Sequence, residues 1–172
     1  MLQNKGEQKV KRVANYGVLV TLALVASYVE TLFPISLGIP GAKIGLANLI
    51  TIVALFLMGW KDAFVISIIR IVLAGFLFGN LFAIFYSLSG AILSLVVMIL
   101  LKKLEFGTIA ISCAGGVSHN VGQISCAALL VENSRLFYYL PVLLIAGVLA
   151  GLVIGVIGGI LIKRLRDVLT SL

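Results

Sequence analysis

Long uninterrupted apolar stretches constrain this chain more than any other feature. The sequence of 172 residues is 62% hydrophobic and 11% charged, whereas soluble domains are about 45–50% apolar and about 25% charged. Each stretch holds roughly 16–25 residues, close to what a helix needs to cross a hydrocarbon core about 30 Å thick. The apolar residues run continuously and do not alternate, which favours helices over barrel strands. We therefore predict an all-α, polytopic membrane protein.

Six membrane-spanning helices fit the pattern, in a single domain of residues 1–172 whose first 12 residues are polar. The expected spans are Val13–Phe33, Lys43–Met58, Ala63–Phe78, Leu81–Leu101, Thr108–Val131 and Tyr138–Ile162. The link Pro34–Ala42 is distinctive, since its prolines and glycines set turns and its apolar residues are expected to pack on the bundle or cap a cavity. The other links are short, which makes consecutive helices antiparallel neighbours. The first span is too long for a signal-peptide core and is expected to be retained.

The basic residues predict the orientation. With the N-terminus inside, ten Lys and Arg side chains lie at the inner ends of the spans and two, Lys43 and Arg135, lie at the outer ends. The positive-inside rule then puts both termini in the cytoplasm. The net charge of +7 is explained by topology, and no nucleic-acid partner is expected.

Polar residues inside the spans are the candidates for function. His119, Asn120 and Gln123 lie in the fifth span, and Arg70 lies midway along the third. His119 and Gln123 are four residues apart, so they share one helix face with Asn120 beside them. Such groups are costly in hydrocarbon and by default indicate a binding site facing the bundle interior. The alternative is hydrogen bonding between helices that stabilises the bundle.

Arg70 allows two interpretations. The guanidinium either pairs with Glu30, the acidic residue in the outer part of the first span, or binds an anionic ligand bidentately. Lys43 begins the second span, where it either extends to the interface or helps to hold an anion at the helix N-terminus. Asn48, about one turn further in, and Asn80, at the start of the fourth span, are further candidates for the same cavity.

Small residues predict close helix packing. The last span carries glycines at strict four-residue spacing, a pattern that allows another backbone to approach closely. The stripe comprises Gly147, Gly151, Gly155 and Gly159. Packing within the chain is one interpretation, and contact with another subunit is the other. Gly17 and Thr21 form a weaker pair of this kind near the inner end of the first span.

The sequence shows no catalytic motif. It contains no phosphate-binding loop for ATP and no cluster of aspartates of the kind that holds Mg²⁺ and a diphosphate. One histidine and two cysteines far apart in one span do not predict a metal site. The expected protein is not an enzyme and has no cofactor of its own.

Three motifs, Pro40–Asn48, Arg70–Gly79 and Gly116–Gln123, resemble the Gx transporter family, which is also described as heptaprenyl diphosphate synthase component I. The resemblance extends over nearly the whole chain. That family resembles the substrate-binding S components of energy-coupling factor (ECF) transporters, small six-helix proteins that work with a membrane coupling subunit and two ATPases. It implies a location in the bacterial cytoplasmic membrane and a cavity lined by Lys43, Asn48, Arg70, His119, Asn120 and Gln123.

Several functions therefore remain open at this stage. The first is a transport subunit that binds a small anionic or polar organic solute, with ATP used only by partner subunits. The second is an accessory membrane subunit of prenyl-diphosphate or quinone metabolism, or of quinone-linked extracellular electron transfer. The third is a scaffold subunit whose functional surface is the glycine stripe. S components often dock their coupling subunit through Ala-x-x-x-Ala on the first helix, and the nearest match here is the pair Gly17 and Thr21.

Overall fold

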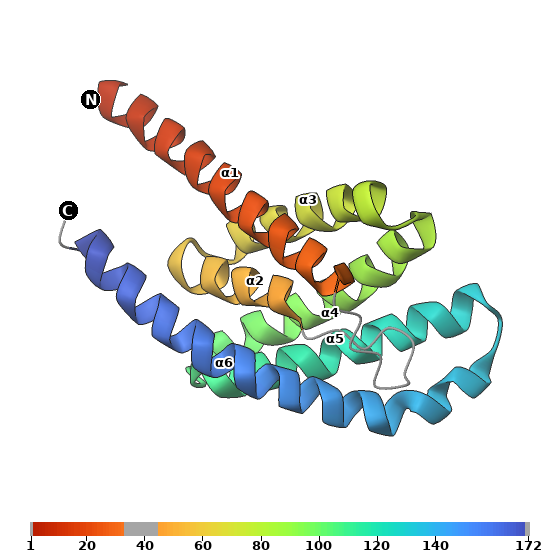
Figure 1. Cartoon of the computed structure of the whole chain (residues 1–172). Coiled ribbons are helices and arrows are strands. Elements are labelled where there is room, and N and C mark those ends of the chain that lie inside the picture. Colours follow the sequence, from red (N-terminus) through yellow and green to blue (C-terminus); the bar gives the residue numbers. More distant parts are fainter. Residues whose placement is uncertain (1, 33–44, 171–172) are drawn as a thin grey trace.

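The computed structural model describes residues 2–32 and 45–170, which form six α-helices and one short 3₁₀ helix (Figure 1). The elements are α1 (Leu2–Leu32), α2 (Leu46–Leu57), α3 (Trp60–Phe78), α4 (Leu81–Lys103), α5 (Thr108–Leu130), η1 (Ser134–Tyr139) and α6 (Leu140–Thr170). No strand occurs in this part of the chain. The predicted all-α, six-helix fold class is confirmed.

The helix boundaries differ from the predicted spans mainly at the chain ends. The first helix begins at Leu2 instead of Val13, and the last continues to Thr170 instead of Ile162. The predictions counted only apolar residues, whereas helical backbone continues into flanking polar sequence. The link predicted before Tyr138 contains the 3₁₀ helix η1, whose preceding Asn133 accepts a hydrogen bond from the Arg135 amide at 3.0 Å.

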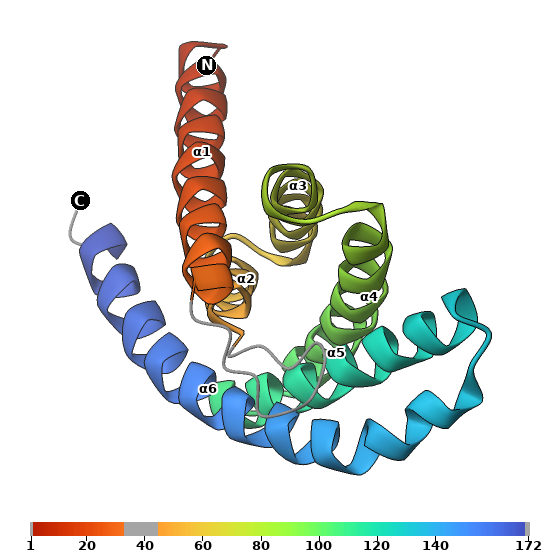
Figure 2. The same ribbon diagram turned by 45° about the vertical axis from the view of Figure 1, so that its right-hand side comes forward.

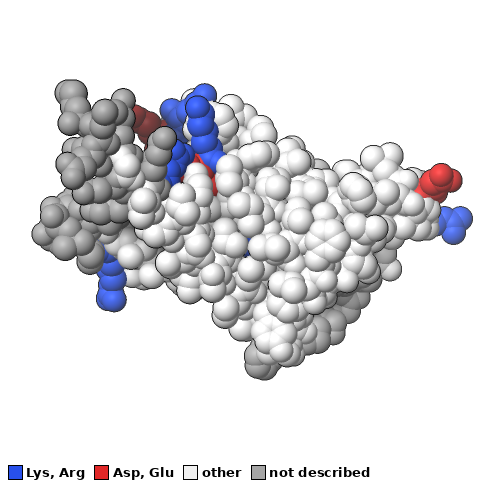
Figure 3. Space-filling model, turned by 90° about the horizontal axis from the view of Figure 1, so that it is seen from above, with Lys and Arg blue, Asp and Glu red and all other residues white. Residues whose placement is uncertain are grey.

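Three of the described helical segments are long and apolar enough to cross a membrane: Arg12–Leu32, Leu81–Lys103 and Ser134–Arg166. Many large apolar side chains on them are exposed, including Leu22, Phe85 and Leu149. Figure 3 shows a broad uncharged surface, with the charged side chains gathered toward its ends. These are the properties of a membrane protein. The helix α2 has only 12 residues and is about 18 Å long, which is short for a hydrocarbon core about 30 Å thick.

Helices α4, α5 and α6 form the tightly packed half of the molecule. Glycines allow this closeness, because a Cβ on Gly116 would lie 2.4 Å from the Gly147 carbonyl oxygen, and a Cβ on Gly122 would lie 2.7 Å from the Ser89 carbonyl oxygen. On α4, Ser94 Oγ donates to the carbonyl oxygen of Gly115 at 2.8 Å. Figures 1 and 2 show α5 and α6 running side by side as a long hairpin, with α4 next to α5.

Helices α1, α2 and α3 form the other half and contact one another in all three pairings. The short helix α2 is anchored at both ends by charged side chains from other helices. At its start, the Leu46 amide donates to Glu30 of α1, and at its end Lys102 of α4 donates to the Leu55 carbonyl oxygen at 2.6 Å. A carboxylate near the N-terminus and an ammonium near the C-terminus both complement the helix dipole. Tertiary contacts therefore stabilise a helix that is short for a membrane.

A buried carboxylate joins α1 to the start of α3. Asp62 accepts hydrogen bonds from Arg12 and Tyr16 and forms an ion pair with Arg12. Burial by itself raises the pKa of the Asp62 carboxyl, but the hydrogen bonds from Arg12 and Tyr16 and the charge of Arg12 outweigh it and hold the pKa below its ordinary value. The network therefore favours the ionised carboxylate in the folded state.

This network predicts a pH-dependent contribution to stability. Because folding lowers the pKa of Asp62, its stabilising effect is complete above the ordinary carboxyl pKa and is lost as the pH falls through the lowered value. We expect Asp62→Asn to cost about 1 kcal/mol at neutral pH, since hydrogen bonds to a charged group are the stronger ones. Unfolding by denaturant at several pH values should show this difference shrinking in acid. A difference that is constant with pH would contradict the assignment.

Candidate functional site

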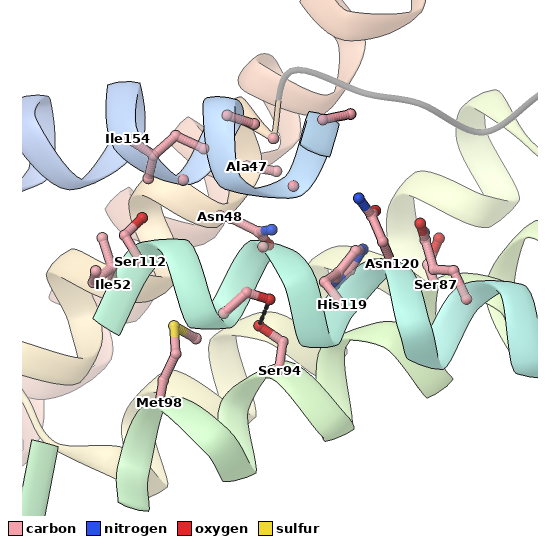
Figure 4. Close-up of a pocket in the computed structure, with 18 of the residues that line it drawn as sticks. Ala47, Asn48, Ile52, Ser87, Ser94, Met98, Ser112, His119, Asn120 and Ile154 are labelled. Atoms are coloured by element: carbon pink, nitrogen blue, oxygen red, sulfur yellow. Dashed lines mark hydrogen bonds between the residues drawn. The ribbon is translucent and has the colours of Figure 1, made fainter. Parts of the chain in front are cut away.

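A polar pocket lies at the boundary between the two halves of the bundle. Every α-helix contributes to its wall, and side chains with oxygen or nitrogen atoms make up much of it. The lining residues are Glu30, Gly45, Ala47, Asn48, Ile52, Arg70, Ser87, Ser94, Met98, Ser112, Gly115, Gly116, His119, Asn120, Gln123, Ala146, Gly147, Ala150, Gly151 and Ile154. Figure 4 shows Ser87, His119 and Asn120 toward one end and Ile52, Met98 and Ile154 toward the other.

The apolar end of the pocket is continuous with the protein core. Ile52, Met98 and Ile154 belong both to the pocket wall and to the main cluster of buried apolar side chains. That cluster joins side chains from α2 to α6. Ser87, His119 and Asn120 therefore lie toward one end of the pocket, and buried apolar side chains of the core border the other end.

Arg70 is the buried cation of this site. It lies on α3 with 9% of its surface exposed and lines the pocket. Within the described residues, its Nε atom is buried without a hydrogen-bond partner, and the guanidinium forms no ion pair. A buried charge that is neither paired nor fully hydrogen-bonded lowers the stability of the fold. Of the two interpretations of Arg70, a direct ion pair with Glu30 is not formed among the described residues. Both residues line the same pocket, and the charge of Glu30 acts on Arg70 without such a contact.

Glu30 and the start of α2 form the acidic side of the site. Gly45 precedes α2 with a φ of 82°, a left-handed conformation that glycine adopts without strain. This turn directs the Leu46 amide toward Glu30, which accepts its hydrogen bond. The predicted anion position at this helix start is therefore occupied by the protein's own carboxylate. Asn48 follows within the first turn of α2 and also lines the pocket.

Three polar residues of α5 line the pocket as predicted, but their contacts differ. Asn120 donates from Nδ2 to the Leu143 carbonyl oxygen of α6 at 2.6 Å, so it has the bundle-stabilising role that the sequence left open. Gln123 is 4% exposed. It packs with His119 against Gly90 of α4, where an added Cβ would lie 2.7 Å from Gln123 Cγ and 3.1 Å from His119 Cε1. The missing side chain at Gly90 therefore leaves space for both polar residues.

Sequence reasoning missed three serines in the pocket wall: Ser87 and Ser94 of α4 and Ser112 of α5. Serine is common in membrane helices and often bonds to the backbone of a turn or a neighbouring helix. Ser94 does so here. The sequence pattern that could have identified two of them is the seven-residue spacing of Ser87 and Ser94, which places both on one helix face. This spacing does not distinguish a serine that contacts a ligand from one that packs against another helix.

Two predicted site residues are not part of the pocket wall as the structure describes it. Asn80 does not line the pocket; its side chain is exposed and accepts a hydrogen bond from the Ala83 amide at 2.8 Å, as an N-cap of α4. Asn at this position is a strong N-cap, which explains its place before a helix. Lys43 lies outside the described residues.

The glycine stripe of α6 packs within the chain. Gly147, Gly151 and Gly155 are buried against α5, and a Cβ on Gly151 would lie 2.5 Å from Cys113 Cα. Gly159 is looser, with Thr108 atoms at 3.9 Å. By contrast, Gly17 and Thr21 of α1 are exposed, and nothing described lies within 4 Å of a Cβ on Gly17.

The arrangement is suited to binding. One cation, one carboxylate, several amide and hydroxyl groups and an imidazole surround a pocket held by rigid helices. Arg70 can hold an anionic group through charge-assisted hydrogen bonds. No group of three or more His, Cys, Asp or Glu side chains within residues 2–32 and 45–170 is placed to hold a metal ion.

Comparison with known proteins gives one match. The family model described as heptaprenyl diphosphate synthase component I matches residues 19–161, which include all six helices in whole or in part. Neither the curated proteins nor the solved structures contain a match.

Proposed function

Because the chain belongs to the heptaprenyl diphosphate synthase component I family, whose description names a component and not a complete synthase, we propose that it acts through partner subunits. Its own function is to bind a small, polar or anionic organic solute in the membrane, as the substrate-binding subunit of an ECF-type transporter. It is not the catalytic subunit of a synthase and carries no cofactor. ATP is used only by its partners, a coupling subunit and ATPases.

The observation that carries this proposal is the pocket around Arg70. A protein that only packs helices has no use for a buried guanidinium whose Nε has no partner among the described residues. Intramembrane ionisable residues mark solute pathways and binding sites more often than structural sites. The wall around Arg70 adds directional donors and acceptors from Asn48, His119 and Gln123, as small-molecule sites usually do.

The proposed topology extends this view. All six α-helices cross the bacterial cytoplasmic membrane, with α2 as a short helix supported at both ends, and both termini are cytoplasmic. The pocket then faces outward, since Glu30 and the start of α2 lie at the end away from the N-terminus. Outward access is what a subunit for uptake requires.

A second candidate function is favoured by the family's description. A component of heptaprenyl diphosphate synthesis would hold or present an isoprenoid lipid, either in that pathway or in quinone-linked electron transfer. The exposed apolar helix faces suit contact with lipid. However, the whole chain has only six acidic residues, and no two of them are adjacent, so the Mg²⁺-binding carboxylates of prenyl transfer would have to come from a partner.

Native mass spectrometry of the full chain purified in mild detergent distinguishes the two functions. We expect one polar metabolite per chain in the wild-type protein, lost in Gln123→Ala because the amide lines the pocket. Asn80→Ala is the matched amide control and should retain the metabolite, since Asn80 only caps α4. A co-purifying prenyl lipid or quinone would replace the transport proposal by the second candidate. Equal retention in both variants would remove Gln123 from the site.

A further inference from the structure

The charges of the pocket restrict the class of solute. We infer that the ligand is an organic molecule with a single anionic group and a separate hydrogen-bond donor, and that Glu30 excludes diphosphates. Arg70 binds the anionic group, and Glu30 accepts the hydrogen bond. This inference rests on the proposed function, because it specifies what the same pocket binds.

The cation is available to a ligand. Arg70 is 9% exposed, lines the pocket and makes no ion pair within the described residues. A guanidinium has five N–H donors in a planar fork and accepts none, so a carboxylate is a well-matched partner. One such anion would compensate the buried positive charge, which has no ion-pair partner in this part of the chain.

The carboxylate also keeps acceptor capacity. Within the described residues, Glu30 accepts a hydrogen bond at one oxygen, Oε1, from the Leu46 amide. An ionised carboxylate offers about four lone-pair positions on two oxygens and has no donor. Glu30 is only partly buried and lines the pocket. It can therefore accept a further hydrogen bond from a ligand donor, such as an ammonium, amide, ring N–H or hydroxyl group.

The charges of Arg70 and Glu30 together argue against a ligand that carries several negative charges. Arg70 and Glu30 are the only Asp, Glu, Lys or Arg among the described lining residues, so this wall has no excess positive charge. A single ligand anion is compensated by Arg70. A diphosphate brings at least one further negative charge, which Glu30 repels inside a site of low effective dielectric.

Binding of inorganic pyrophosphate tests whether Glu30 repels a diphosphate. We expect Glu30→Gln to bind it at least about ten-fold more tightly than wild type, since the charge is removed at short range. The glutamine oxygen still accepts the Leu46 hydrogen bond. Glu132→Gln, an exposed site outside the pocket, should behave like wild type. Binding is measured by calorimetry on the full chain in detergent. Equal affinity of wild type and Glu30→Gln, or no binding by either, overturns the assigned role of Glu30.

The identity of the co-purified molecule gives an independent test that needs no variant. A wild-type ligand with one anionic group and a donor supports the inference. A bound water-soluble diphosphate overturns this inference but leaves a solute-binding protein. A prenyl diphosphate, a quinone, another apolar lipid, or no bound solute overturns the proposed function itself, so the two failures are distinguishable.

Discussion

Replacing Gly151 by leucine is expected to destabilise the folded protein by about 3 kcal/mol, the upper part of the usual range for overpacking. The reason is that α5 and α6 meet there backbone to backbone. A Cβ on Gly151 would lie 2.5 Å from Cys113 Cα and 2.8 Å from the Ser112 carbonyl oxygen. Main-chain atoms cannot move aside as the end of a flexible side chain can, so the helices must separate. Reversible unfolding in mixed SDS and detergent micelles measures the loss.

A control on the same stripe makes this prediction specific. At Gly159 the nearest described atoms to an added Cβ are those of Thr108, at 3.9 Å, which is ordinary van der Waals contact. Gly159→Ala should therefore keep the fold and gain about 0.5–1 kcal/mol from better helix propensity. If Gly151→Leu were as stable as wild type, the close α5–α6 contact would be wrong. If Gly159→Ala were as damaging as Gly151→Leu, the effect would not come from the contact distance.

The second large effect is expected at Arg70. We expect Arg70→Gln to lower the affinity for the solute about 100-fold, because two charge-assisted hydrogen bonds together contribute about 3 kcal/mol. The stability of the unliganded protein should be unchanged or higher, since the variant removes a buried charge whose Nε has no described partner. Binding sites often carry such a cost in stability.

Calorimetry with the co-purified solute and thermal unfolding without it measure the two effects separately. Arg135→Gln is the matched control, because Arg135 is exposed, lies in η1 and does not line the pocket. It should leave the affinity unchanged. Wild-type affinity in Arg70→Gln would remove Arg70 from the site. Strong destabilisation of the unliganded variant would instead indicate a structural role for the guanidinium.

The sequence predicted the helices well because hydropathy and turn residues act within each segment of the chain. Long apolar runs interrupted by turn residues determine where helices form, and the observed α4, for example, differs from its predicted span only at Lys102 and Lys103. The positions at which helices begin or end were harder to predict where the flanking sequence is polar. The N-terminal residues 2–12 continue α1 although they are too polar to cross a membrane.

The candidate site was predictable in part. Arg70, His119 and Gln123 were identified because polar groups stand out against apolar spans, and the structure brings them to one pocket with Asn48, Asn120 and Glu30. Asn80 was expected in the same cavity but does not line this pocket, because its side chain caps α4. The serines were missed because serine is common in membrane helices, and its spacing does not distinguish a hydroxyl that lines a pocket from one that packs against a neighbouring helix.

The sequence by itself determined the membrane character, the number and approximate extent of the helices, and which residues are too polar to face lipid, because these depend on hydropathy and helical period within each segment. Only the tertiary structure decided that Glu30 caps α2 without an ion pair to Arg70 and that Asn120 donates a hydrogen bond to α6. It also decided that Gly147, Gly151 and Gly155 of the glycine stripe are buried against α5. Those outcomes depend on which helix faces meet and at what depth. Such contacts are set by packing between segments far apart in the sequence, which no local pattern encodes.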